Sequence, residues 1–169
     1  MPEDSTYTLT AAGWPRPRSG GLPVPWVAPA EALGEMNEGR RLATVGGAIC
    51  NVCGEGFPAL GDAFGFTAFT FDGVDQETLP LEFGTSVAEL PEINPQDHVE
   101  FLDGAVMHWR CARLAATLCP HIAKRNDLVC LRVPANDANP RMVDEKLTLT
   151  YSVLDCDYAP WPTTMPIYP

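Results

Sequence analysis

The sequence predicts an α+β fold organised around a pair of cysteines, with proline-rich arms at both ends of the chain. Three observations lead to this prediction. The two cysteines form the stretch CNVCG at residues 50–54. Residues 107–119 have the apolar spacing of a helix, and strand-like patterns follow them. The 17 prolines are clustered, mainly toward the two ends, which favours extended segments attached to a folded centre.

Length and composition indicate one domain. A chain of 169 residues with 46% hydrophobic residues is long enough to bury a sizeable core without disulfide bonds or other cross-links. No run approaches the roughly 18 apolar residues of a membrane span, and the N-terminal stretch MPEDSTYTLT is unlike a secretory signal. We therefore expect a cytoplasmic protein that does not contact a membrane. Six cysteines are present, and in a reducing cytosol clustered cysteines more often bind metal or do redox work than form disulfides.

Charge is unevenly distributed along the chain, whose net charge is −11. Between Arg41 and Arg110 there is no lysine or arginine, but there are eleven acids. These acids are Glu55, Asp62, Asp72, Asp75, Glu77, Glu82, Glu89, Glu92, Asp97, Glu100 and Asp103. The simplest interpretation is a solvated surface. The alternatives are an acidic face that binds a basic partner and an acidic face that imitates DNA. The negative net charge also disfavours broad contact between this protein and nucleic acid.

The N-terminal arm is punctuated by proline and glycine. Its stretch WPRPRSGGLPVPWVAP favours extended, polyproline-like chain, and its tryptophans make it apolar enough to lie against the globule. We expect this arm at residues 1–35 and an α+β domain at 36–135 that contains an acidic insert at 72–103. A C-terminal strand and proline-rich tail occupy 136–169.

The first half of the domain shows weaker patterns than the second. Residues 30–49 predict a short helix that ends at the glycines at 46 and 47. Residues 61–73, rich in phenylalanine and threonine between Asp-Gly turn signals, predict a strand. Its aromatic residues fall on both faces, so it is either buried on both sides or bulged. Residues 74–103 predict loop with at most a short helix.

The second half contains the clearest helix, MHWRCARLAATLC at residues 107–119. Asp103 is its candidate N-cap and Pro120 ends it. The stretch LVCLRVP at 128–134 predicts a short strand, and KLTLTYSVLD at 146–155 alternates as a second strand does.

The pair Cys50 and Cys53 has the spacing of a metal-binding knuckle. Two thiolates in a tight turn can share one ion, and the glycine that follows allows the left-handed conformation in which N–H groups face the sulfurs. A redox dithiol and a pair of core cysteines are the alternatives. A thioredoxin-like dithiol opens a helix after a strand, but Gly54 and the nearby Gly56 and Pro58 disfavour a helix here.

His108 and Cys111 supply the two further ligands that a tetrahedral zinc site requires. At spacing i, i+3 near a helix start, both side chains project from one face. The partly positive helix N-terminus also favours a thiolate there. The sequence therefore predicts a structural zinc ion bound by Cys50, Cys53, His108 and Cys111.

The order CxxCG, strand-like segment and HxxC at a helix start resembles the treble-clef zinc fingers. The resemblance implies a knuckle, a β-hairpin and a helix around the ion, although the long insert between the two ligand pairs departs from compact members. The stretches GLPVPWV, CNVCGEGF and MHWRCARLAATLCPHI also resemble short proteins of actinobacteria and their phages. That resemblance covers roughly residues 20–125 and implies no known reaction.

The remaining cysteines have other predicted roles. Cys119 and His121 flank Pro120 and form an alternative ligand pair, although a buried thiol beside a capping histidine suits the end of a helix better. Cys130 lies in an apolar strand and is expected in the core. Cys156, between two aspartates, is expected to be a surface or edge thiol.

No catalytic or cofactor-binding residue is predicted. A closed Cys3His site leaves no position for substrate, and neither a phosphate loop nor a nucleophile elbow is present. We expect a non-catalytic module that binds another protein through its acidic surface and its Pro/Trp-rich arms. A small nucleic-acid-binding regulator, a degenerate HNH-like nuclease and an acidic DNA mimic are the alternatives. The candidate contacts for nucleic acid or a partner are Arg110, Arg113, Lys124 and Arg125.

Overall fold

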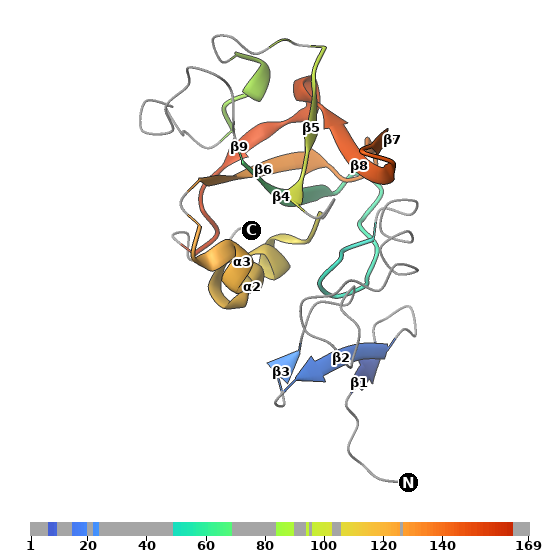
Figure 1. The fold of residues 1–169 in the computed structure, drawn as a ribbon, viewed down its shortest axis with the longest axis vertical. Helices are drawn as coiled ribbons and strands as arrows, with labels where there is room; N and C mark the ends of the chain where they lie inside the picture. The colour runs from blue at the N-terminus through green and yellow to red at the C-terminus, as the bar shows by residue number, and fades with distance from the viewer. Residues whose placement is uncertain are drawn as a thin grey trace, which may run out of the picture.

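The computed structural model describes residues 7–9, 15–19, 22–23, 49–68, 84–89, 94, 96–102, 106–125 and 127–163. Within these ranges the protein combines antiparallel sheets with two helices (Figure 1). This confirms the predicted α+β class. The helix expected within residues 30–49 lies outside the described residues, apart from residue 49.

The central sheet has the order β4-β6-β9 and is antiparallel. Its strands are β4 (Asp62–Ala68), β6 (Leu128–Pro134) and β9 (Asp157–Ala159). Both β4 and β6 are rich in apolar residues and are buried along most of their length, as strands covered on both faces must be. Strand β6 matches the predicted strand at 128–134, and β4 is the described part of the one predicted at 61–73.

The second sheet has the order β5-β8-β7, with strands β5 (His98–Glu100), β8 (Lys146–Ser152) and β7 (Asn139–Val143). The sequence predicted only β8, which gives way at its end to the 3-10 turn η4 (Val153–Asp155). Residues 98–100 were expected to be loop and are a strand instead. Strand β7 has no buried residue, so it lacks the alternation by which β8 was found.

Helix α2 (Trp109–Leu118) is followed directly by α3 (Pro120–Ala123). Proline ends the first helix, as predicted, because it cannot donate a backbone hydrogen bond; it also suits the first position of the second helix. The predicted N-cap, Asp103, is wrong. The cap position is His108, whose extended backbone starts the helix without a side-chain cap bond.

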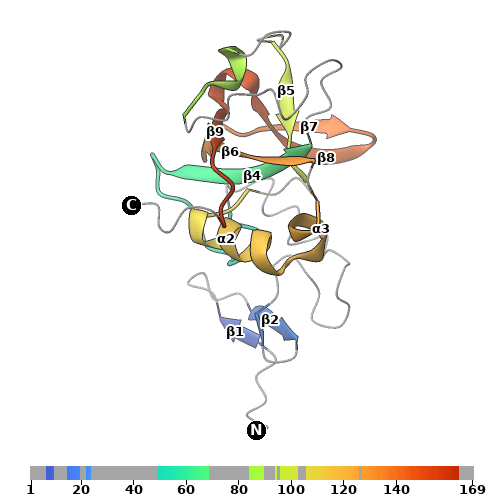
Figure 2. The ribbon, with the colours of Figure 1, turned by 90° about the vertical axis from the view of Figure 1, so that its left-hand side faces the viewer.

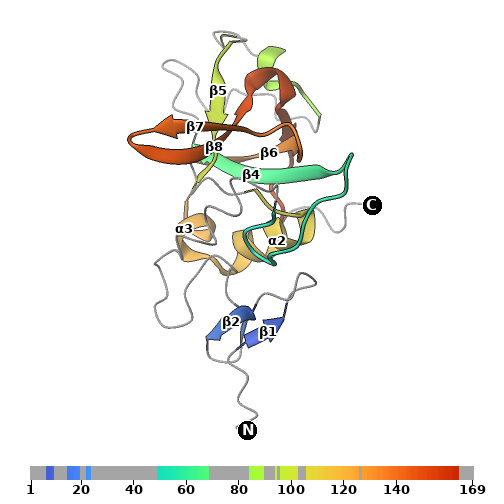
Figure 3. The same cartoon turned by 90° about the vertical axis from the view of Figure 1, so that its right-hand side faces the viewer.

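The central sheet lies between α2 on one side and the second sheet on the other (Figures 2 and 3). Alternation along β6 shows how the sequence supports both faces. Leu128 and Cys130 point toward the helix, whereas Val129, Leu131 and Val133 point toward the second sheet. Cys130 is buried, which confirms its predicted place in the core.

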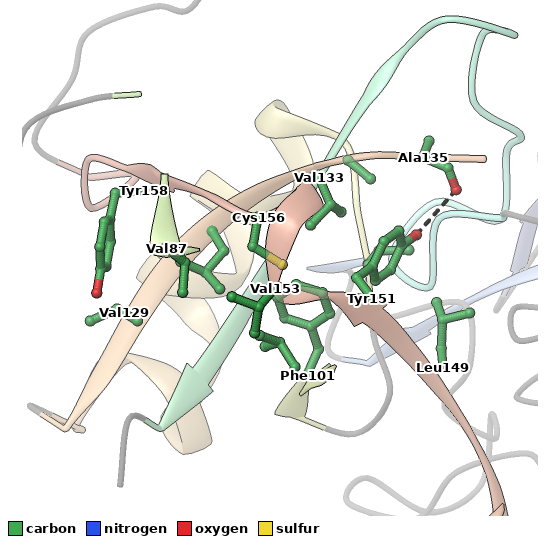
Figure 4. Packing of buried hydrophobic residues seen from close by; sticks show 14 residues of the cluster. Val87, Phe101, Val129, Val133, Ala135, Leu149, Tyr151, Val153, Cys156 and Tyr158 are labelled. Atoms are coloured by element: carbon green, nitrogen blue, oxygen red, sulfur yellow. Dashed lines mark hydrogen bonds between the residues drawn. The ribbon is translucent and has the colours of Figure 1, made fainter. Parts of the chain in front are cut away.

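The core between the two sheets, here called the sheet-sheet core, is almost wholly apolar. Its buried members are Ala63, Val87, Val99, Phe101, Val106, Val129, Leu131, Val133, Ala135, Leu149, Tyr151, Val153, Cys156 and Tyr158. The Tyr151 hydroxyl donates a hydrogen bond of 3.1 Å to the carbonyl oxygen of Ala135 (Figure 4). Cys156 is fully buried, so the expectation of a surface thiol is wrong: the 3-10 turn η4 directs its side chain inward, despite the flanking aspartates.

The core between the central sheet and α2, here called the helix-side core, contains four cysteines. Its buried members are Cys50, Val52, Cys53, Phe64, Phe66, Met107, Trp109, Cys111, Ala112, Ala116, Ile122, Leu128, Cys130 and Ala159. Phe64 and Trp109 have ring centroids 4.8 Å apart, and Phe66 and Trp161 are 5.1 Å apart. Trp161 brings the start of the C-terminal tail onto this core.

Both long edges of the central sheet are paired with further backbone. On the β4 edge, Phe64 and Met107 exchange two backbone hydrogen bonds of 2.9 and 2.8 Å. On the β9 edge, residues 84–87 run alongside, and Tyr158 bonds to the backbone of Gly84 and Thr85. The pair at Phe64 places Met107 one residue before His108, which fixes the start of α2 against β4.

Three short strands are described near the N-terminus: β1 (Tyr7–Leu9), β2 (Pro15–Ser19) and β3 (Leu22–Pro23). They form an antiparallel sheet in the order β1-β2-β3. Within the described residues, no helix is long and apolar enough to cross a membrane.

Candidate metal centre

A tight backbone turn presents the first cysteine pair. The amide of Cys50 donates to the carbonyl of Glu55 at 2.9 Å, and the amide of Gly54 donates to the carbonyl of Cys50 at 2.8 Å. Ile49 and Gly56 close the turn as an antiparallel bridge. Gly54 has a φ of 72°, a conformation that residues with a Cβ disfavour. The sequence CNVCG therefore folds locally into a knuckle.

The second pair comes from the start of α2. His108 occupies the cap position, and Cys111 lies in the first turn on the buried side of the helix. The chain just before the helix is held by backbone hydrogen bonds at two places. Met107 pairs with Phe64, and the amide of Asn51 donates to the carbonyl of Val106 at 3.2 Å. The knuckle therefore contacts the start of the helix through a backbone hydrogen bond as well as through the four clustered side chains.

The four predicted ligands converge. The Sγ atoms of Cys50, Cys53 and Cys111 and a ring nitrogen of His108 all lie within 4.8 Å of one another. Sγ of Cys53 is 3.4 Å from Nδ1 of His108. The cysteines are buried and the histidine is half-buried. These four side chains are close enough to hold one metal ion.

The His108 ring is oriented by two groups of the knuckle. Its Nε2 lies 3.2 Å from the carbonyl oxygen of Gly56, and its ring centroid is 4.5 Å from that of Phe57. A carbonyl oxygen only accepts, so Nε2 is the donor and Nδ1 faces the sulfurs. Such a second hydrogen bond is what fixes the ring and tautomer of a metal-binding histidine.

The pKa values of three residues of the cluster are shifted strongly, and the two cysteines among them shift in opposite directions. Hydrogen bonds from Cys111 and then Cys50 hold the pKa of Cys53 far below its usual range. Hydrogen bonds to Cys50 and Cys53 raise the pKa of His108 to about 10. The pKa of Cys111 is raised by its hydrogen bonds to Cys50 and Cys53 and by burial.

These opposite shifts have one physical cause. Hydrogen bonds within the partly buried cluster favour one thiolate that accepts from a protonated thiol and an imidazolium, and burial adds to the protonation of Cys111. A divalent cation reverses this balance because it stabilises several thiolates and a neutral imidazole together. The cluster has the donor set and the charge balance that such an ion needs.

A shallow depression opens beside the cluster. It has a cavity volume of about 550 Å³ and is lined by Cys53, Arg110, Cys111, Arg113 and Leu114. Arg110 also reaches back to the knuckle, where its Nη2 lies 3.4 Å from Oε2 of Glu55.

The alternative ligand pair and the bases Lys124 and Arg125 are not part of the cluster. Among the described residues, the only grouping of cysteine, histidine and acidic side chains compact enough for a metal ion is the four named above. Cys119 is half-buried and His121 is exposed, so the alternative ligand pair is not part of it. Lys124 is exposed, and Arg125 pairs with Asp127.

Sequence reasoning missed the groups that support the ligands. Gly56 contributes a backbone carbonyl, Phe57 a ring face and Glu55 a carboxylate to the helix start. The residues were visible as the EGF that follows CNVCG, but a carbonyl contact fifty-two positions along the chain leaves no sequence signal.

Comparisons with protein-family models, with curated proteins and with solved structures found no match. The resemblance to treble-clef fingers and to actinobacterial proteins therefore stays a prediction.

Proposed function

We propose that Cys50, Cys53, His108 and Cys111 bind a structural zinc ion, and that the protein is a non-catalytic interaction module built on that ion. The observation that carries the zinc proposal is the convergence of three sulfurs and one ring nitrogen within 4.8 Å. Three thiolates and one imidazole are a donor set typical of structural zinc, which takes four ligands in a tetrahedron.

The surroundings support a structural rather than a catalytic ion. All four positions of a tetrahedron are taken by side chains of this chain, so none remains for substrate. Among the described residues, neither His98, which lies on β5 of the second sheet, nor the exposed His121 belongs to the cluster, so neither is placed beside the ion as a general base. The ion would therefore act on folding, and such sites contribute on the order of 10 kcal/mol.

The architecture around the ion is compatible with a treble-clef-like arrangement. The knuckle comes first, the antiparallel contact between β4 and Met107 follows, and α2 supplies the second ligand pair. In this interpretation the residues between β4 and Met107 are an insert into the hairpin.

The interaction role is supported by charge and composition. The stretch from Glu55 to Asp103 carries eleven acids and no lysine or arginine, and the chain ends are rich in proline and tryptophan. Such surfaces suit a basic protein partner. Six of these eleven acids lie outside the described ranges, so the proposal rests on the sequence here.

The decisive experiment is metal analysis of the purified protein and its variants. Wild-type protein is expected to carry one zinc per chain, and Cys53→Ser to lose the metal and to have a much lower melting temperature. Cys119→Ser is the matched control because this thiol lies outside the cluster; it should keep the metal and most of the stability. An unchanged melting temperature in Cys53→Ser, with zinc retained, contradicts the proposal.

A second candidate function is a small nucleic-acid-binding regulator that uses the bases of α2 and α3. The observation in its favour is that residues 104–126 contain four bases and no acid. Binding to random duplex that weakens steeply with salt would support it, and no binding at low salt would remove it.

A further inference from the structure

The outer surface of α2 and α3 differs in charge from the rest of the chain. The whole chain has 22 acids against 11 bases. The segment between Asp103 and Asp127 has no acid, and its bases are Arg110, Arg113, Lys124 and Arg125. Lys124 is exposed, and the Arg110 side chain is 72% exposed. A basic island of this kind on an acidic protein attracts negative charge.

Apolar side chains lie within the same surface. Leu114 is 44% exposed and Leu118 is 55% exposed. Together with Arg110 they form an i, i+4, i+8 row on α2, which places the three side chains one above another on a helix. The opposite side of the helix is buried through Trp109 and Ala112. Because the two leucines are exposed and the opposite side of the helix packs in the helix-side core, the row points away from the central sheet.

The depression beside the metal cluster is lined by both basic and apolar side chains. Arg110, Arg113 and Leu114 contribute to its lining, and Cys53 and Cys111 contribute from the metal cluster. A carboxylate placed between the two guanidinium groups would form charge-assisted hydrogen bonds, and an apolar side chain beside it would cover Leu114. One short segment of a partner protein could supply both the carboxylate and the apolar side chain.

The existing partner of Arg110 does not block such a contact. Its ion pair with Glu55 has an N–O distance of 3.4 Å, and the glutamate side chain is 36% exposed. Exposed pairs of this kind contribute little and exchange readily, so an incoming carboxylate can share or replace Glu55.

We propose that the α2 face formed by Arg110, Arg113, Leu114 and Leu118 binds an acidic, amphipathic protein segment. The segment's carboxylates pair with the arginines, and its apolar side chains cover the leucines. The proposal rests on the interaction role proposed above and gives the chemistry of a partner for α2, a different surface from the acidic stretch. It depends on the metal centre only because that centre holds α2 in place.

A protein segment fits this face better than nucleic acid does. Leucines between arginines offer nothing to a phosphate backbone, whose binding strength follows the number of cations in contact. At least two of the four bases already have carboxylate partners, since Arg110 pairs with Glu55 and Arg125 with Asp127. Interfaces between proteins, in contrast, combine an apolar centre with charged groups at the rim.

The test is a selection from a displayed library of random 16-residue peptides on the zinc-loaded, full-length protein. The selected peptides are then measured by fluorescence anisotropy against wild type and charge-reversal variants. Arg113→Glu alters the proposed face. Arg141→Glu is its matched control, because Arg141 is an exposed arginine on β7 of the second sheet. Leu114→Ser is compared in the same way with Leu154→Ser, whose leucine is 62% exposed on η4.

We expect the selection to enrich peptides with two or more Asp or Glu residues flanking a large apolar residue. Arg113→Glu should weaken their binding about tenfold and Leu114→Ser several-fold, with both controls within about twofold of wild type. Enriched peptides that are neutral or basic, or that bind Arg113→Glu and Arg141→Glu equally, overturn the proposal.

Two further outcomes separate this proposal from its alternatives. Tighter binding of a 20-base-pair duplex than of any selected peptide overturns it in favour of nucleic acid. Failure to enrich any peptide on protein that contains zinc overturns it as well, but leaves the structural-zinc proposal standing. Absence of zinc from the purified protein counts against the structural-zinc proposal alone.

Discussion

The central sheet divides the molecule into two halves that are held together differently. On the side of the second sheet, the core consists of aliphatic and aromatic side chains and Cys156, and the Tyr151 hydroxyl there donates a hydrogen bond to a backbone carbonyl. On the side of α2, three cysteines and a histidine gather within 4.8 Å at the centre of the contact. One half is stabilised mainly by burial of apolar surface, whereas the other gathers four ionisable side chains at one point, which burial by itself would penalise.

This difference shows why a bound metal ion would add stability mainly in one half. Sheets stack through regular alternation and require no special group. Helix α2 is ten residues long, too short to be stable alone, and the knuckle has no regular structure to contribute. An ion held by the four side chains would join these two weak elements, and the regular core next to it provides the surface on which they pack.

Removal of the metal should have the largest effect and should separate the two halves. We expect a strong chelator to abolish hydrogen-exchange protection in residues 50–56 and α2, because a site of this type contributes on the order of 10 kcal/mol. Protection in β6 and β8 should fall much less. Mass-spectrometric hydrogen exchange with and without chelator measures this; equal loss in both regions would show that the halves are one cooperative unit.

Gly65→Ala should damage the sheet-sheet core and leave the metal centre intact. A Cβ at Gly65 would lie 2.4 Å from the Phe101 ring, and overpacking of a buried site costs about 1–3 kcal/mol. Gly56→Ala is the control in the other half, because no atom lies within 4 Å of a Cβ there. Urea denaturation and zinc content measure both; equal stability of the two variants would contradict the packing described.

Alkaline pH should weaken the sheet-sheet core through Cys156. Burial, and then the nearby Asp155 and Asp157, raise the pKa of this thiol from 9.0 to about 12. The folded state therefore keeps a proton that the unfolded state releases above pH 9.0, so the stabilisation is complete below that pH and is lost as pH rises toward about 12. We expect a loss of about 2 kcal/mol by about pH 10.5. Cys156→Ala should have a flatter stability profile between these pH values, and an unchanged slope would exclude this thiol as the cause.

The smallest effect is expected from the ion pair at the edge of the metal centre. Arg110→Ala removes an exposed contact with Glu55 and should lower the free energy of unfolding by less than about 1 kcal/mol. Thermal denaturation of this variant and of Glu55→Gln measures the effect. A loss comparable to that of Gly65→Ala would mean that the pair is a structural part of the helix-side core.

The sequence predicted the site better than it predicted the fold around it. Ligand spacing is local, so CxxCG and HxxC could each be recognised within four or five residues. The strand at 128–134 was also predicted, because a continuous apolar run indicates a strand covered on both faces. The contact that joins the two ligand pairs, between Phe64 and Met107, depends on tertiary structure and has no local pattern.

The errors have equally local causes. Strand β7 is exposed throughout, so it carries no hydrophobic alternation, and β5 is only three residues long. Cys156 was misplaced because its two aspartate neighbours suggested solvent. A 3-10 turn at the end of β8 makes neighbours in sequence point in different directions, and a turn of this kind is not indicated by residue types alone.

The pairing at both edges of the central sheet has a consequence for behaviour at high concentration. An open strand edge is a template on which another chain can add, which leads to aggregation. Here Met107 occupies part of the β4 edge and residues 84–87 occupy the β9 edge. In the second sheet, the edge strand β7 carries Pro140 and Arg141, residues that discourage the addition of a further strand. The most apolar strands of the described protein are thereby kept from joining those of another copy.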